Sequence, residues 1–221
     1  MVLGRFQNFI VGKRLNKDSP PPHFLRFRSS KLFIIATICI AIFSDVFLYG
    51  VIVPVVPFSI SERAGVPESD VQHWTSVLLA VYGAALLVSA PVAGFLADHS
   101  PNRRLPLMGG LVVLTAATIL LCLAQSVGVL VVGRLFQGLA AGIVWTVGQA
   151  LLVDTVGQAE IGQVMGYVSI SMSVGIMMSP LLGGVVYDAA GYYAVYYMCF
   201  GILGLDILLR HVISSYTRTV Y

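Results

Sequence analysis

Charged residues are scarce in this sequence: they make up 10% of its 221 residues, whereas 57% are hydrophobic. About a quarter of the residues in an ordinary soluble domain are charged, so the composition argues against that class. The hydrophobic residues form long runs, and roughly 20 mostly apolar residues are enough to cross a bilayer as a helix. Barrel strands would give short alternating segments instead. The sequence therefore predicts a polytopic, all-α membrane protein.

Motifs of catalysis and metal binding are also missing. The sequence has no phosphate-binding loop, dinucleotide fingerprint, nucleophile elbow or zinc-protease histidine pair. Its four histidines are scattered, and its three cysteines fall inside apolar runs without metal-ligand spacing. We interpret the cysteines as buried apolar fillers. We therefore expect no enzyme activity, no catalytic residue, no metal site and no cofactor.

Six apolar runs are long enough to span a membrane, and short connections make consecutive spans antiparallel neighbours. We expect one six-helix bundle over residues 32–210, between a basic, disordered cytoplasmic N-terminus at 1–31 and a short cytoplasmic tail at 211–221. No cleavable signal peptide is found near Met1, so the first span is expected to direct insertion. The six predicted spans are 32–58, 74–97, 106–126, 128–152, 161–186 and 192–210.

Lysine and arginine lie mainly on one side of these spans. They crowd the N-terminal segment, the connection after the second span and the tail after the sixth, whereas the opposite side has only Arg63. Cytoplasmic loops carry such an excess of positive residues. The distribution predicts that both termini are cytoplasmic, and it agrees with an even number of spans.

Two ionisable residues, Asp45 and Arg134, lie well inside predicted spans. A charge in the bilayer is costly unless it is paired or hydrated, so both are functional candidates. At 1.5 Å per residue, Asp45 lies about 20 Å from the cytoplasmic end and Arg134 about 9 Å from the opposite side. The arginine could then reach the carboxylate if the two spans are adjacent. The pair is either a packing salt bridge or a site where Asp45 binds a cation or proton in a central cavity.

Small and polar residues continue along the fourth span. Gly138 and Gly142 follow Arg134 at intervals of four residues and share its face, which lets helices approach closely. Gln137 lies beside this stripe and, with Arg134, suggests a hydrated or ligand-lined surface. Trp145 also lies beside it and is equally consistent with the apolar core.

The fifth span contains "GYVSISMSVGIMMSPLLGG", which begins at Gly166. Gly175, Ser179 and Gly183 fall on one helical face and predict close approach of a neighbouring helix. Gly166 and Gly184 are each nine residues from Gly175, roughly half a turn away at 100° per residue.

Pro180 interrupts the backbone hydrogen bonds of the same span, because it cannot donate to the carbonyl of Ile176. We expect a bend at this position. In lipid, such a break is tolerated when neighbouring helices or serine side chains satisfy the freed carbonyl.

The connection between the second and third spans reads "GFLADHSPNRRLPLMGG". Gly94 allows close packing near the helix end, and Asp98 precedes a tight turn that continues into Arg103 and Arg104. Such a turn can hold helices together by charge-assisted hydrogen bonds, with Asp154 as a candidate partner for the arginines. A solvated turn that follows the positive-inside rule is an equally good interpretation.

Together these segments resemble the N-terminal half of a major facilitator superfamily transporter, most closely fungal twelve-span drug:proton antiporters and vesicular amine transporters. Four motifs between about residues 45 and 210 carry the resemblance, in the expected order. The loop departs from the usual family pattern in two ways: His99 stands where Arg or Lys is usual, and Arg103 and Arg104 come one position later than in the common spacing. In the fifth-span motif, Ser179 stands in place of a glycine. The motifs are Asp45 to Pro54; Gly94, Asp98, Arg103, Arg104 and Pro106; Arg134, Gln137, Gly138 and Ala141; and Gly166, Gly175, Pro180, Gly183 and Gly184.

The resemblance implies proton-coupled export of drugs or other small organic compounds, energised by a proton gradient. It implies that Asp45, Arg134 and Gln137 couple substrate to protons, and that Asp45 and Arg134 approach each other. The loop residues would control conformational change, and the fifth-span glycines would form the antiporter motif. A fungal plasma or vacuolar membrane fits the resemblance.

Transporters of this family have two six-helix halves with the substrate between them. We therefore expect the chain to be a truncated product or an alternative gene model. Its expected partners are the lipid bilayer, a small-molecule substrate, protons and a missing C-terminal or homologous half. No nucleic acid is expected among them. Two alternatives remain. One is a nutrient facilitator or symporter on the same fold, and the other is a non-transporting half that acts by dimerising.

Overall fold

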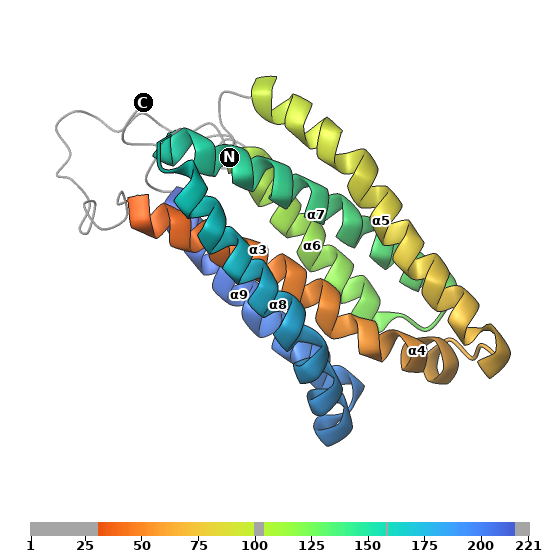
Figure 1. Cartoon of the computed structure of the whole chain (residues 1–221). Coiled ribbons are helices and arrows are strands. Elements are labelled where there is room, and N and C mark those ends of the chain that lie inside the picture. The colour runs from red at the N-terminus through yellow and green to blue at the C-terminus, as the bar shows by residue number, and fades with distance from the viewer. Residues whose placement is uncertain (1–30, 100–103, 158, 215–221) are drawn as a thin grey trace, which may run out of the picture.

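The computed structural model describes residues 31–99, 104–157 and 159–214, which form a bundle of long helices (Figure 1). Six of the described helical segments are long and apolar enough to cross a membrane, which confirms the predicted all-α architecture. Residues 1–30 and 215–221, which include most of the two predicted terminal segments, lie outside the described residues. The helices are α3 (Lys31–Ile52), α5 (Glu68–His99), α6 (Arg104–Leu123), α7 (Val127–Val156), α8 (Ile161–Ala190) and α9 (Tyr192–Ser214).

The first span changes helix type after α3, where two prolines remove backbone donors. It continues as a 3₁₀ turn, η1 (Val53–Val55), a short α4 (Val56–Phe58) and a π-type turn, η2 (Ser59–Arg63). Ser59 Oγ donates to the Val55 carbonyl at 3.0 Å within this irregular part of the span. The whole segment remains long enough to span as one unit, Leu32–Arg63.

Charged and glycine residues mark the helix ends. α5 begins at Glu68, six residues before the predicted span, and Glu68 and Asp70 in its first turn suit the positive end of the helix dipole. α7 and α8 each end at a glycine with positive φ, 75° at Gly157 and 80° at Gly191. Each glycine amide donates back into its helix, the usual way to terminate one.

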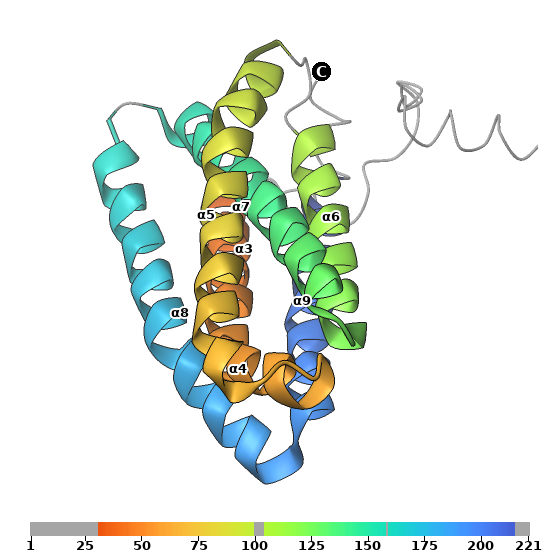
Figure 2. The same ribbon diagram turned by 90° about the vertical axis from the view of Figure 1, so that its right-hand side faces the viewer.

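The helices pack as close pairs. α5 lies along α7 and α8 lies along α3, as both views show (Figures 1 and 2). Of the six spans, α3 and α7 are the most buried, whereas α5 and α8 are the least buried. The main apolar cluster joins the later part of the first span to α6 and α9, with Phe47, Leu114 and Val195 among its members. The two ionisable residues inside the predicted spans, Asp45 and Arg134, lie on these two most buried helices.

Arg63 ties together the end of the bundle predicted to face away from the cytoplasm. Its Nε donates to the Ala124 carbonyl at 3.2 Å, and its guanidinium lies 4.3 Å and 5.0 Å from the ring centroids of Tyr192 and Tyr193. Tyr192 in turn donates to the Leu121 carbonyl at 2.7 Å. One side chain thus joins the end of the first span, the α6–α7 connection and the start of α9.

Candidate functional site

Asp45 lies on α3 in the interior of the bundle, with only 2% of its surface exposed. Its Oδ2 accepts a hydrogen bond of 2.8 Å from Nε1 of Trp145 on α7. An indole N–H needs an acceptor when it is buried, and a carboxylate is a strong one. The two central helices are therefore joined by a charge-assisted contact deep in the first and fourth spans.

Arg134 is fully buried on α7, with 0% exposure. Its Nη1 donates to Oε1 of Gln137 at 2.9 Å, a contact between residues three apart on one helical face. Its guanidinium carbon lies 5.7 Å from the centroid of the Tyr49 ring, at the outer limit of a cation–π contact. The positive charge is thus placed against an amide and an aromatic face.

Asp45 and Arg134 each have a different hydrogen-bond partner among the described residues, although the sequence led us to expect that they meet. Trp145, the partner of Asp45, follows Arg134 by eleven residues, or about 16 Å along α7. The two polar contacts therefore lie at different levels of the bundle. The depth estimate from the sequence treated both spans as straight and vertical, so it could not separate these levels.

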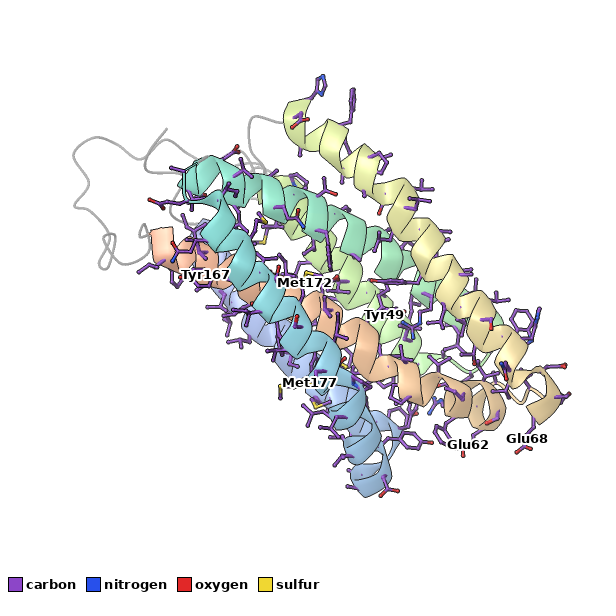
Figure 3. The ribbon with its side chains drawn as sticks, in the orientation of Figure 1. Tyr49, Glu62, Glu68, Tyr167, Met172 and Met177 are labelled. Atoms are coloured by element: carbon purple, nitrogen blue, oxygen red, sulfur yellow. The ribbon has the colours of Figure 1, made fainter. Side chains whose placement is uncertain are left out.

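A stacked tyrosine pair lies between these two levels. Tyr49, labelled in Figure 3, follows Asp45 by one helical turn. Its ring stacks on Tyr82 of α5 at 4.5 Å between centroids. Tyr82 is within electrostatic range of both Asp45 and Arg134. The site is thus a continuous polar core from Trp145 and Asp45, through the tyrosines, to Arg134 and Gln137.

The glycines of α7 pack against α5, as their spacing predicted. A Cβ atom on Gly138 would overlap the Tyr82 carbonyl oxygen and lie 2.8 Å from Ala85 Cβ. One turn later, a Cβ on Gly142 would overlap the Ser89 hydroxyl. Ser89 Oγ lies 3.4 Å from the Gly138 carbonyl oxygen, a long hydrogen bond between the helices. The glycines therefore set the distance between α5 and α7, which positions Tyr82 in the polar core.

The predicted small-residue stripe of the fifth span also contacts a neighbour, and that neighbour is α3. A Cβ on Gly175 would lie 3.3 Å from Val46 Cγ1, and a Cβ on Gly183 would overlap the Val51 carbonyl oxygen. Ser179 is fully buried between them, against Gly50 of α3. The stripe confirms the predicted close approach, and its contacts on α3 run from Phe43 to Val51, on both sides of Asp45 in the sequence.

The remaining glycines of this motif lie away from α3. Cβ atoms added to Gly166 and Gly184 would meet no atom within 4 Å. They lie off the packing stripe, as the nine-residue spacing predicted. The motif therefore combines residues that contact α3 with residues that lie on another face of α8.

Pro180 lies inside α8, which continues on both sides of it from Ile161 to Ala190. Ser179 Oγ lies 3.5 Å from the carbonyl oxygen of Ile176, the acceptor that the proline leaves without its usual backbone donor. This long hydrogen bond matches the expectation that a serine compensates for the break. It also explains why the serine sits in a position that is otherwise occupied by glycine in the motif.

The structure describes only part of the predicted conformational loop. Gly94 packs near α7, since a Cβ there would lie 3.4 Å from Thr146 Cγ2. Asp98 and Asp154 are exposed at the ends of α5 and α7. Arg103 lies outside the described residues, and Arg104 begins α6 with a side chain that is not described. The pairing of these arginines with Asp154 stays a prediction.

Three aromatic residues of the polar core were not among the predicted site residues: Tyr49, Tyr82 and Trp145. Trp145 gave a signal in the sequence, because an indole N–H in an apolar span needs one of few available acceptors. Tyr49 also gave one, because it shares a helical face with Asp45. Tyr82 gave none, since its position depends on how α5 packs against the glycines of α7.

Comparison with known proteins decides the family. The profile of the Major Facilitator Superfamily matches residues 38–217, which is most of the chain. The chain belongs to the Major Facilitator Superfamily. This assignment accounts for the six membrane-length helices and for the small-residue packing of α5 on α7 and of α8 on α3.

Curated relatives extend this assignment. An uncharacterised MFS-type transporter of Schizosaccharomyces pombe is 47% identical over 85% of this chain, and the MFS-type transporter ppzB of Metarhizium rileyi is 37% identical over 92%. A probable vesicular acetylcholine transporter of Danio rerio is 30% identical over 72%. The matches cover 42%, 42% and 33% of these relatives, so the chain spans about two fifths of their length or less.

Proposed function

We propose that this chain forms one half of a proton-coupled transporter that exports small organic compounds. The observation that carries the proposal is the buried Asp45–Trp145 contact between the two central helices. A carboxyl group inside a membrane protein that is joined to a second helix can change both its charge and its partner. Proton binding at Asp45 would therefore act directly on the contact between α3 and α7.

The surrounding residues support a coupling role for this carboxylate. Tyr82 lies near both Asp45 and Arg134, so the two charged residues border the same part of the core. The glycine contacts on both sides hold α5 against α7 and α8 against α3. Proton binding in this core would shift the relative stability of the helix arrangements that open to each side of the membrane.

The exchange direction rests on the fifth-span motif, and the substrate class rests on the relatives. The motif resembles that of drug:proton antiporters and packs directly beside Asp45 on α3. Relatives of this chain include transporters named for acetylcholine, a small organic cation. We therefore favour export of small organic compounds in exchange for protons over sugar-type uptake, and we place the pathway in a multi-pass membrane protein with cytoplasmic termini.

The fluorescence of Trp145 should report the protonation of Asp45. The sequence has two tryptophans, so Trp74→Phe leaves Trp145 as the single emitter. We expect its emission to change in one transition as the purified chain is titrated with acid, because protonation weakens the charge-assisted bond to its indole N–H. The measurement is a fluorescence titration in detergent or nanodiscs.

Adding Asp45→Asn to the Trp74→Phe background should remove this transition. The matched control is Asp188→Asn, which changes an exposed carboxylate of α8 and should leave the titration unchanged. If the transition persisted without Asp45, the titrating group would lie elsewhere and the proposed coupling residue would be wrong.

Transport is tested in liposomes with an imposed pH gradient. We expect no proton-coupled movement of a cationic dye with the chain alone. We expect movement when it is co-reconstituted with the C-terminal half of the 47% identical S. pombe relative. Asp45→Asn should abolish the proton dependence of that movement. Absence of flux in the paired sample, with flux in the intact relative, would favour a half that does not transport.

A further inference from the structure

The buried edge of Arg134 carries hydrogen-bond donors without partners in the described part of the chain. Its Nε and Nη2 have no partner there, and neither does Nε2 of Gln137. Both side chains are buried, with exposures of 0% and 1%. Buried polar groups in folded proteins are nearly always hydrogen-bonded, so such a concentration on two adjacent side chains calls for an explanation.

All of these atoms are donors. The guanidinium has five N–H bonds and uses Nη1 to bond Gln137, while Nε and Nη2 retain three N–H bonds. The amide nitrogen of Gln137 adds two more. The Gln137 oxygen already accepts from Nη1. The local site thus offers positive charge and N–H bonds.

Aromatic residues form the rest of this surface. The Tyr49 ring faces the guanidinium at 5.7 Å, and Tyr196 of α9 is within electrostatic range of it. The buried Tyr196 hydroxyl makes no hydrogen bond of standard geometry, and the nearby Tyr192 hydroxyl donates to Leu121. A face of an aromatic ring stabilises a cation only weakly compared with the cost of burying an arginine charge.

We propose that Arg134 and Gln137 bind a small monovalent anion inside this half, between α3, α7 and α9. One anion can accept from Nε–H and from the Nη2–H beside it, together with one N–H of Gln137, and it offsets the guanidinium charge. A water molecule would accept only two of them, would bring two protons of its own that need acceptors, and would leave the charge uncompensated. Both donor-bearing side chains have almost no accessible surface, so neighbouring side chains must move apart to admit the anion, and we restrict the proposal to a halide or a carboxylate group.

This site is separate from the proposed proton site. Asp45 bonds Trp145, which lies about 16 Å along α7 from Arg134. The stacked Tyr49–Tyr82 pair lies between the two levels. The two proposals rest on different contacts and have separate tests, so each can fail without the other.

The test compares the thermal stability of the purified chain in sodium gluconate, whose anion is the bulkiest of the series, with its stability in other sodium salts of equal ionic strength. We expect chloride and bromide to raise the melting temperature in a saturable way. Formate provides the second arm. A rise with formate as large as that with chloride would identify the general carboxylate class, and a rise with halides alone would identify an inorganic ion. Equal stability in all salts would overturn the proposal.

Gln137→Glu supplies an internal anion beside Arg134 and should remove the salt-specific stabilisation while the protein stays folded. The matched control is Gln163→Glu, which makes the same charge change at an exposed position of α8 and should keep the effect. A halide effect of unchanged size in the Gln137→Glu variant would place the anion elsewhere and overturn the assignment.

Chloride NMR line broadening tests binding in the wild-type chain, so its result does not depend on whether a variant folds. We expect the wild-type chain to broaden the chloride signal beyond the broadening from matched detergent, and excess bromide to reverse the added broadening. Broadening equal to that of detergent alone would contradict the proposal.

Discussion

Gly138→Ala should lower the stability of the bundle, although alanine is the better helix former by about 1 kcal/mol. The added methyl group would overlap the Tyr82 carbonyl oxygen and lie 2.8 Å from Ala85 Cβ and 3.2 Å from the Leu86 backbone nitrogen. Two of these atoms belong to the backbone of α5, so the helices must separate. We expect a loss of roughly 1–3 kcal/mol, the usual range for overpacking, measured as a lower melting temperature in detergent.

Gly128→Ala is the matched control, because it lies on the same helix and a Cβ there meets no atom within 4 Å. It should be neutral or slightly stabilising through helix propensity. We thus expect Gly138→Ala to lower the melting temperature and Gly128→Ala to leave it unchanged or raise it slightly, with a difference larger than experimental error. Equal melting temperatures would show that α5 and α7 do not pack through Gly138.

Gly183→Ala and Gly184→Ala should separate the two roles of the adjacent glycines in the fifth-span motif. A Cβ at Gly183 would overlap the Val51 carbonyl oxygen and lie 3.1 Å from Val51 Cγ2, whereas a Cβ at Gly184 would meet nothing within 4 Å. We expect Gly183→Ala to destabilise the chain by roughly 1–3 kcal/mol and Gly184→Ala to leave its stability nearly unchanged.

The measurement is the melting temperature of both variants beside wild type, with membrane insertion checked by yield in the membrane fraction. If Gly184→Ala lowered the melting temperature, a neighbouring part of the isolated chain would have to cover the helix surface at Gly184. An unaffected Gly183→Ala would contradict the α3–α8 contact on which the packing of the motif rests.

The packing stripes could be predicted from the sequence because they depend only on local spacing. Gly175, Ser179 and Gly183 share a face in any α-helix, and small residues at that spacing admit a neighbouring helix. Which helix would approach was not fixed by this pattern. The choice of α3 depends on the tertiary arrangement, in which Val46, Gly50 and Val51 supply the opposing surface.

The polar partners could not be predicted, because a side-chain contact depends on the rotation and axial shift of each helix. Asp45 and Arg134 were correctly identified as buried charges from their positions in apolar runs. The axial offset between α3 and α7 brings Trp145, eleven residues after Arg134, to hydrogen-bond distance from Asp45, and no local pattern specifies that offset. The small predicted difference in depth was within the error of straight, parallel spans.

Arg63 has a consequence for the order in which the chain assembles during synthesis. Its backbone acceptor, on Ala124, comes 61 residues later, and its aromatic partners follow at the start of the sixth span. The end of the first span therefore cannot acquire its full set of contacts until the sixth span has been made. A ribosome-bound chain that ends before this span would leave the arginine without its two tyrosine rings.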